Sequence, residues 1–424
     1  MKTREVYVVG GARIPFMKSM TTYQSVTTQE LMTASLTALV NKYNLKGKTV
    51  GDVALGAIMN SSANWNLARE VVQSSGLAAD TPAYNVQRAC GTSLETALQI
   101  AHKISAHQIE SGIAGGVDSN SDLPIMTSRA LSQKLIQLNS ARTFGEKLKI
   151  ILSFRLSDLK PVLPAVVEPR TGKSMGEHCE IMVKEWQIPR NEQDELALAS
   201  HLNGAKAYKD GFYNDLVFPF LGKAADGPLR GDTTLEKLAK LKPAFDKSEK
   251  GTLTAGNSSP LTDGSSAVLL ASKEEAAKNN WPTLAKFVDS QTSAVDYVGG
   301  EGLLMAPTVA VSELLKRNNL KLQDFDYYEI HEAFAGQVLC TLKAWESAEY
   351  CQKRLGRSEA LGKIDRTKLN VHGSSLALGH PFGATGGRII ATLAKTLHQA
   401  GPNKRGLISI CTAGGMGVAA ILES

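Results

Sequence analysis

Short apolar runs alternate with helix-like patterns along the first part of the chain. Residues 5–15 read EVYVVGGARIP, which is typical of a buried strand that ends in glycines. Residues 28–42 repeat apolar side chains at helical spacing, and strand-like runs follow at 53–60 and 111–119. This alternation predicts α/β layers around a central sheet.

The alternation stops near residue 120 and resumes near residue 250. The stretch between holds prolines, basic residues and scattered helical patterns, one of them at 192–209. A structureless loop of that length is improbable, so we interpret residues 121–249 as an inserted loop domain. The predicted first half therefore covers 1–120 and is completed by about 250–275. Residues 276–424 form the second half, and a weak internal repeat relates the two.

Composition indicates a folded protein with more than one core. The chain has 424 residues, 43% hydrophobic and 21% charged, with a formal net charge of +6. That length predicts two or three domains. Dense basic runs with interleaved aromatic residues are absent from the sequence, so nucleic-acid binding is not expected.

Five cysteines without regular spacing do not form a disulfide framework. The sequence has neither a CxxC pair nor HExxH, so we expect no metal site. It also lacks a signal peptide or a run long enough to span a membrane, which predicts a reducing, cytoplasmic location.

Cys90 lies where a predicted turn ends and a helix begins. Thr92 and Ser93 are positioned to cap that helix, and Leu94 and Leu98 repeat at helical spacing. Free amides and the positive helix end favour a thiolate, which can attack a carbonyl while the amides hold the oxyanion. A small buried hydrophobic residue is the alternative interpretation.

Three further residues lie at comparable junctions. His331, in EIHEAFAG, follows an apolar run and precedes a predicted helix, where ligands of α/β sheets bind, although a lone histidine is often structural. His380, in GHPFGATGGR, lies among small residues and could take a proton from a thiol or donate to an oxyanion. Cys411, in CTAGGMG, follows a strand and could exchange a proton, or could simply be a core cysteine.

Taken together, RACGTS, HEAF, GHPFGATGGR and CTAGGMG, in this order and with GNSSPLTDGSSAV, resemble the thiolase family. The resemblance covers essentially the whole chain. HEAF in place of the commoner NEAF, and the segment 141–176, are similar to the degradative branch that forms the β-subunit of fatty-acid oxidation complexes. The resemblance implies the thiolase fold: two similar α/β halves, each with a central mixed sheet, layered α-β-α-β-α, plus a loop domain that cradles CoA.

The resemblance also implies a reaction, the cleavage of a 3-ketoacyl-CoA by CoA. Cys90 would be the acyl-accepting nucleophile and His380 would activate it. Acetyl-CoA would leave as an enolate that Cys411 protonates, and Cys411 would then take the proton of a fresh CoA thiol. CoA is a substrate here, and no cofactor or metal is implied.

Two oxyanions would need stabilisation in such a reaction. His380 and His331 would hold the thioester oxygen, with His331 replacing the family's usual Asn. The backbone N–H groups of Cys90 and Ala413 would hold the acyl intermediate. Ser259 occupies the position that contacts pantetheine in relatives, and Met175 matches a residue at the substrate entrance.

Residues 141–161 combine positive charge with apolar side chains. The basic residues are Arg142, Lys147, Lys149, Arg155 and Lys160, and the apolar ones are Phe144, Leu148, Ile151, Leu152 and Phe154. Such a segment can lie on a membrane, dock a partner or pack on its own domain. The resemblance favours docking of an α-subunit with enoyl-CoA hydratase and hydroxyacyl-CoA dehydrogenase activity, in an assembly that is at least a homodimer.

Three alternatives stay open from the residues alone. Ketoacyl synthases share a nucleophilic cysteine but lack a second cysteine with the role of Cys411. A short-chain acetoacetyl-CoA thiolase would use the same chemistry, but some of those enzymes carry His where Ser174 stands. A non-catalytic, lipid-binding homologue would have lost at least one of Cys90, His331, His380 or Cys411.

Overall fold

The computed structural model describes residues 3–164 and 166–424. Its strands are β1 (Val6–Arg13), β2 (Met17–Lys18), β3 (Asp52–Leu55), β4 (Ala83–Asn85), β5 (Ser111–Asp118), β6 (Thr262–Ser272), β7 (Ala285–Ala294), β8 (Tyr327–Ile330), β9 (Arg405–Thr412) and β10 (Met416–Glu423). Its longer helices are α1 (Thr28–Lys42), α2 (Leu67–Ser75), α3 (Thr92–Ser105), α4 (Arg129–Ser140), α5 (Phe144–Leu152), α6 (Met175–Glu185), α7 (Arg190–Lys209), α10 (Ala306–Arg317), α11 (Ala335–Glu346), α12 (Ala348–Leu355) and α14 (Thr385–Ala400). Three short helices are α8 (Leu235–Ala239), α9 (Lys273–Lys278) and α13 (Ser375–Leu378).

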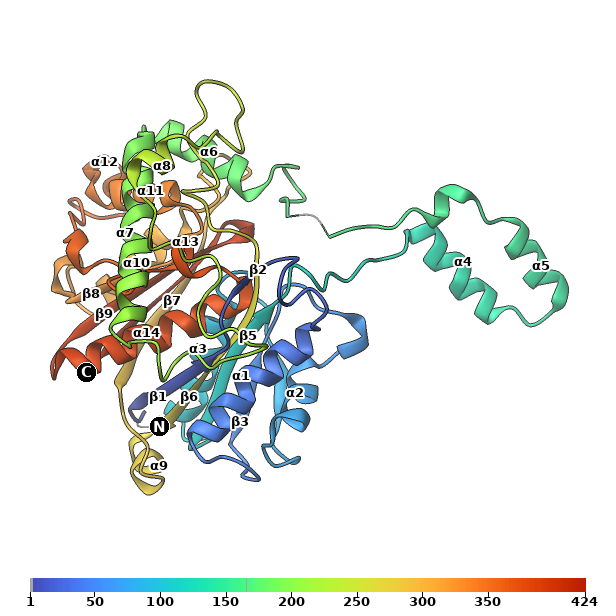
Figure 1. Ribbon diagram of the computed structural model, residues 1–424, viewed down its shortest axis with the longest axis horizontal. Helices are drawn as coiled ribbons and strands as arrows, with labels where there is room; N and C mark the ends of the chain where they lie inside the picture. The colour runs from blue at the N-terminus through green and yellow to red at the C-terminus, as the bar shows by residue number, and fades with distance from the viewer. Residues whose placement is uncertain (1–2, 165) are drawn as a thin grey trace.

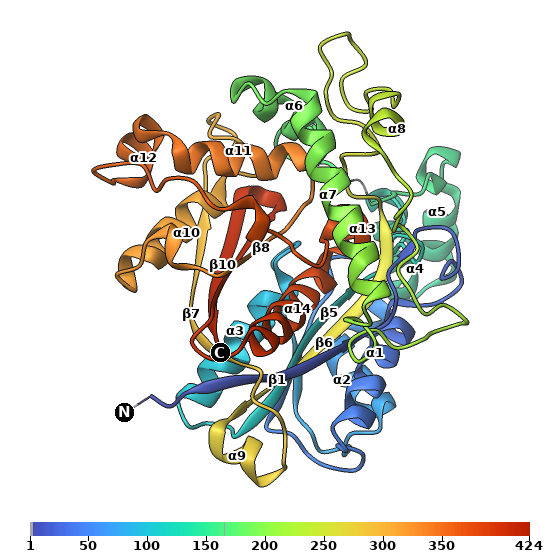
Figure 2. The same cartoon turned by 60° about the vertical axis from the view of Figure 1, so that its left-hand side comes forward.

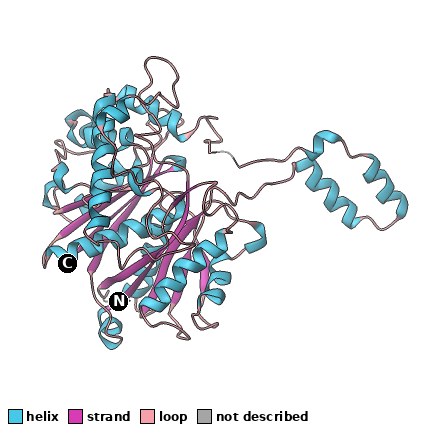
Figure 3. Ribbon diagram, viewed as in Figure 1, coloured by secondary structure: helices cyan, strands magenta, loops and turns pink. Residues whose placement is uncertain are grey.

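The strands at the centre of the molecule (Figure 3) are hydrogen-bonded into one continuous path, which consists of two sheets with the same pairing pattern joined at β1 and β7. In the first, β3 is parallel to β5, β5 is antiparallel to β6, and β6 is antiparallel to β1. In the second, β8 is parallel to β9, β9 is antiparallel to β10, and β10 is antiparallel to β7. The repeat predicted from sequence is therefore present as a repeat of topology. A short antiparallel pairing of β1 with β7 joins the sheets edge to edge.

Five layers result from how helices cover these sheets. α1 and α2 pack on the outer face of the first sheet, in a core that includes Leu36 and Val72. α10 and α11 pack outside the second sheet, in a core that includes Leu314 and Trp345. α3 and α14 lie between the sheets and share one buried cluster with strands of both. This is the α-β-α-β-α arrangement that the resemblance implied.

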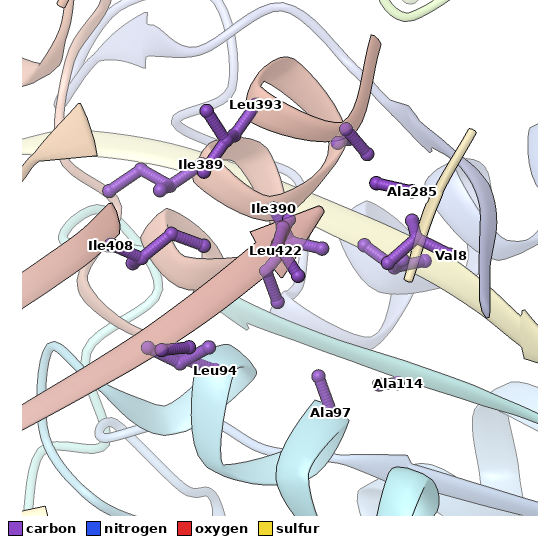
Figure 4. Packing of buried hydrophobic residues seen from close by; sticks show 14 of the residues in the cluster. Val8, Leu94, Ala97, Ala114, Ala285, Ile389, Ile390, Leu393, Ile408 and Leu422 are labelled. Carbon is purple, nitrogen blue, oxygen red and sulfur yellow. The ribbon is translucent and has the colours of Figure 1, made fainter. Parts of the chain in front are cut away.

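The central layer is made of small and branched apolar side chains (Figure 4). Leu94 and Ala97 of α3 and Ile389, Ile390 and Leu393 of α14 are all buried there. Strand residues from both halves, among them Val8, Ala114, Ala285, Ile408 and Leu422, complete the cluster. Because α3 and α14 are covered on both sides, the loops that lead into them are held in fixed positions.

The inserted region has two unlike parts. α6 and α7 lie against the second half of the molecule, where α6 contacts α11 and α7 contacts α11 and α13 (Figure 2). Residues 124–164, which we call the arm, extend away from the body and carry α4 and α5 (Figure 1). No helix among residues 3–164 and 166–424 is long and apolar enough to cross a membrane.

The arm does not pack its apolar side chains on its own domain. Within these described helices, neither α4 nor α5 buries a single residue, and Phe144 and Leu152 are 81% and 77% exposed. The arm is closed at its base by paired backbone hydrogen bonds between Met126 and Val162. The interpretation of 141–161 as a surface helix covering its own core is therefore wrong.

Candidate active site

Cys90 occupies a tight turn between β4 and α3. The residue before it, Ala89, has φ of 44°, a left-handed conformation that only a well-supported turn maintains in a non-glycine residue. Thr92 supports the turn, since its hydroxyl donates to Ala89 O at 2.7 Å and accepts from Arg88 N at 2.9 Å. α3 has Gly91 as its N-cap and no side-chain cap, so the capping role predicted for Thr92 and Ser93 is wrong.

Ser93 instead joins α3 to the entrance of α14. Its Oγ accepts a hydrogen bond from Gly387 N at 2.8 Å. Neighbouring Gly386 is so close to α3 that a Cβ there would lie 2.3 Å from the backbone nitrogen of Leu94. The glycines of GATGG therefore allow two backbones to meet, which places the His380 loop beside Cys90.

The two histidines and the first cysteine form one cluster. The sulfur of Cys90 and a ring nitrogen each of His331 and His380 lie within 4.8 Å of one another. His331 follows the end of β8, and its Nδ1 is 2.9 Å from Ser375 Oγ. His380 Nδ1 is 2.6 Å from Thr385 Oγ1. Both rings are buried, whereas Cys90 is partly exposed and reachable.

Cys411, the last but one residue of β9, is buried beside the same cluster. Burial raises the pKa of the Cys411 thiol well above its ordinary value, and a charge on Cys90 would raise it further. The backbone N–H of Ala333 faces the sulfur and favours its thiolate. The structure thus brings together all four predicted catalytic side chains, from four separate motifs.

Cys90 is a thiol at rest, contrary to the thiolate expected from the helix N-terminus. Its own N–H and that of Ala413 do lower the pKa, in the expected direction. Burial outweighs them and raises the pKa of Cys90 to about 12. Burial also lowers the pKa of His380 to about 3 and that of His331 well below its ordinary value. A neutral base therefore stands beside a neutral nucleophile.

Ser259 and Met175 lie near this cluster but in different ways. Ser259 donates from both its backbone nitrogen and its hydroxyl to Ala333 O, at 3.0 and 2.9 Å, so it fixes the HEAF loop. Met175 begins α6 and packs against the apolar cluster that contains Cys411. Ser174 caps α6 by accepting from Glu177 N.

The cluster also has the composition of a transition-metal site. Cys90, His331 and His380 are the only such group among the described residues, and one sulfur with two imidazoles is a donor set that Zn²⁺ accepts. Our expectation from the sequence, that the chain uses no metal, stays a prediction.

Sequence models of the two thiolase domains match nearly the entire chain. The thiolase N-terminal domain matches residues 6–274, and the thiolase C-terminal domain matches residues 281–424.

The chain belongs to the thiolase family.

Curated relatives and solved structures agree with this assignment. The chain is 40% identical over 430 residues to a 3-ketoacyl-CoA thiolase of Shewanella baltica, covering all of this chain and 97% of the relative. It is 39% identical over 424 residues to one of Yersinia pestis, covering 99% and 96% of the two chains. Human mitochondrial 3-ketoacyl-CoA thiolase superposes with a TM-score of 0.82 at 29% identity, covering both chains fully. Its complex with CoA gives a TM-score of 0.80 at 29% identity, covering 99% and 98%.

Several residues that shape this thiolase site were not found from the sequence. Glu168 accepts hydrogen bonds from Gly414 N at 2.6 Å and Tyr297 OH at 3.0 Å, and so holds the turn after Cys411. Asp118, fully buried, accepts from Gly383 N at 2.7 Å and thereby holds the His380 loop. Their carboxylates accept hydrogen bonds from backbone N–H groups that are distant in the sequence, so no local sequence pattern identifies them.

Proposed function

We propose that this thiolase cleaves 3-ketoacyl-CoA with CoA, giving acetyl-CoA and a shortened acyl-CoA. The observation that carries the proposal is the convergence of Cys90, His331, His380 and Cys411 in one cluster of side chains. Support comes from the relatives, which match this chain over nearly their full length and are named 3-ketoacyl-CoA thiolases. One superposed structure is a complex with CoA.

In the first half-reaction the neutral pair at Cys90 and His380 creates the nucleophile. His380 takes the thiol proton as the sulfur attacks the keto carbon, and the N–H groups of Cys90 and Ala413 hold the oxyanion. The bond between carbons 2 and 3 then breaks, leaving an acyl thioester on Cys90. The electron pair passes to an enolate whose oxygen accepts from His331 and His380, and Cys411 protonates its carbon.

The second half-reaction restores every group. The Cys411 thiolate takes the proton of a CoA thiol, whose sulfur attacks the acyl thioester. Cys90 leaves as a thiolate and recovers its proton from His380. Splitting the cleavage into two steps with a covalent intermediate lowers each barrier. Burial raises the pKa of both thiols, so each is protonated between turnovers.

Degradation of medium or long chains is favoured over acetoacetyl-CoA specificity. The likeness to an acetyl-CoA acetyltransferase of Bacillus anthracis (TM-score 0.81, 30% identity, covering 100% and 99%) keeps the short-chain enzyme as the second candidate. Ser174, a helix cap here, stands where some short-chain enzymes carry His.

The decisive experiment measures CoA-dependent cleavage of 3-ketoacyl-CoAs from four to sixteen carbons, with wild type and Cys90→Ala. Cleavage of longer chains that vanishes in the variant, together with an acyl mass on wild-type Cys90, supports the proposal. Activity confined to acetoacetyl-CoA would support the short-chain enzyme. No cleavage of any chain would overturn the proposal.

We also propose an assembly of at least two copies, in the cytoplasm. β4 is an edge strand that pairs only with β3 among the described residues, and Trp65 nearby is 86% exposed. A second copy can cover such an edge. All five cysteines are free, as is usual in a reducing compartment.

The arm is proposed to dock an α-subunit of a fatty-acid oxidation complex. Besides its exposed apolar side chains it has seven basic residues and two acidic ones, so its partner surface is expected to be apolar with negative charge. Co-purification with an α-subunit from the same source tests this. Binding to anionic vesicles instead would assign the arm to a membrane.

A further inference from the structure

A chain of hydrogen bonds leads from a buried arginine to His331. Arg388 of α14 is 1% exposed, and its Nη2 lies 3.0 Å from Ser375 Oγ and 3.2 Å from Ser374 Oγ. Ser375 Oγ in turn lies 2.9 Å from His331 Nδ1. Ser375 has these two partners and, among the described residues, no other hydrogen-bonding group at its hydroxyl.

The chemistry of these groups determines which one donates in each of the two hydrogen bonds at Ser375. A guanidinium has donors only and stays protonated in proteins, so Ser375 must accept from Arg388. A serine hydroxyl has a single proton, and its one remaining partner is His331 Nδ1. If that proton did not go to Nδ1, a buried O–H would be left without an acceptor, which is unfavourable.

We infer that Arg388, acting through Ser375, holds His331 in the neutral tautomer whose proton is on Nε2. This inference rests on the proposed function and deepens it. His331 Nε2 is buried and has no hydrogen-bond partner among the described residues. The relay therefore makes that nitrogen a ready donor for the thioester oxygen as its negative charge develops. The opposite tautomer would present a lone pair to the enolate and repel it.

The surroundings agree with this assignment. Burial, with the charges of His380 and Arg388, lowers the pKa of His331, so the ring is neutral and its tautomer matters. Burial lowers the pKa of Arg388, and a charge on buried Glu329, two residues before His331, opposes that shift, although burial raises the pKa of Glu329 itself to about 8. Arg388 and Ser375 are thus positioning residues, because neither touches the reacting atoms.

The segment that carries Ser375 is itself tied to the HEAF loop. Glu332 accepts from Leu376 N at 3.2 Å and from Asn370 Nδ2 at 2.7 Å. Asn370 also bonds both backbone groups of Ile330 at 2.9 Å. Ser375 and His331 are therefore held in register by contacts on either side, so removal of one hydroxyl need not move the ring.

The test compares Ser375→Ala with Ser374→Ala. Both variants remove one hydroxyl that accepts from Arg388, but only Ser375 contacts His331. ¹⁵N spectra of the histidine-labelled protein distinguish protonated from unprotonated ring nitrogens, and His331→Asn identifies the His331 signals. We expect Nε2–H in wild type and in Ser374→Ala, and a mixture of tautomers in Ser375→Ala. For 3-ketoacyl-CoA cleavage, we expect kcat to fall roughly tenfold with KM unchanged in Ser375→Ala only.

Arg388→Met should likewise mix the tautomers, because the Ser375 hydroxyl is then no longer oriented by the guanidinium and can turn its proton away from Nδ1, and Arg388→Lys should restore Nε2–H. If Arg388→Met does not fold, the comparison of Ser375→Ala with Ser374→Ala still tests the inference. A wild-type His331 with its proton on Nδ1, or an unchanged tautomer in Ser375→Ala, would overturn the inference. So would an equal loss of kcat in Ser374→Ala. A wild type with the expected tautomer but no thiolysis would instead refute the proposed function.

Discussion

The imidazole rings of His331 and His380 lie with their centroids 4.1 Å apart and their planes inclined by 49°. One ring comes from the loop after β8 and the other from the loop before α14. A positive charge on His380 lowers the pKa of His331 at this distance, so protonation of one ring keeps the other neutral. The pair can therefore hold a single transferred proton, from Cys90, while the second ring still donates to an oxyanion.

Two substitutions of His331 distinguish its proposed hydrogen bond to the enolate oxygen from any other role of the imidazole ring. His331→Ala removes one donor to the enolate oxygen and is expected to lower kcat about 10²–10³-fold with little change in KM. His331→Asn keeps an amide donor and should retain most of the activity that alanine loses. Steady-state thiolysis with both variants checks this. Equal rates for the two would show that hydrogen-bond donation at this position is not used.

The reactivity of Cys90 should keep rising with pH well into the alkaline range. Its pKa is raised to about 12, so at pH 8 its thiolate fraction is smaller than that of an ordinary cysteine. The rate of alkylation by iodoacetamide should grow about tenfold per pH unit from pH 7 to 10, without the plateau that a free thiol shows near pH 8.5. Intact-mass measurement with Cys90→Ala as the blank follows the rate. A plateau anywhere below pH 10 would contradict the raised pKa.

The sequence marked the four side chains that the structure brings together, because each lies in a short motif at the end of a strand or helix. The bounds of α1 were also predicted correctly, since its apolar repeat and the capping box of Thr27 and Glu30 are local signals. Glu168, Ser375 and Arg388 were not predicted as site residues, because their importance depends on which backbone group or side chain contacts them in the folded state. The prediction of a thiolate at Cys90 was wrong for the same reason, since burial is a property of the whole fold.

Glu168 is expected to support catalysis by holding the turn after Cys411. Glu168→Ala leaves Gly414 N and Tyr297 OH without their shared acceptor, which should lower the free energy of unfolding by about 1–3 kcal/mol. We expect kcat to fall at least about tenfold, because Ala413 belongs to the same turn. Tyr297→Phe, which removes the other partner alone, is the control and should keep most of the activity. Equal losses in both variants would show that the Gly414 contact is unimportant.

A buried ion pair connects β1 to the inserted region. Arg13 and Asp226 bond through two contacts of 2.6 Å, and Asp226 also accepts from Phe16 N and Tyr208 OH. Asp226→Ala leaves a buried guanidinium unpaired and should destabilise the fold by about 3–5 kcal/mol in urea at pH 7. Tyr208→Phe loses one hydrogen bond and should cost only about 1 kcal/mol. A loss below 1 kcal/mol for Asp226→Ala would contradict this account.

The arm should be dispensable for folding and for chemistry. Since its apolar residues are exposed, deleting it removes little buried surface, and Met126 and Val162 already pair as the ends of a hairpin. Replacing residues 127–161 with Asn-Gly, which suits a two-residue turn, should leave the urea midpoint and the kcat on short substrates within about twofold of wild type.

The same deletion should abolish association with the α-subunit, measured by co-elution in gel filtration. A matched variant in which Phe144, Leu148 and Leu152 become Ser keeps the arm and its charge but loses its apolar surface. If apolar contact drives docking, both variants fail to bind. If the Ser variant binds as wild type does, docking depends on the basic residues, and its affinity should then fall steeply with added salt.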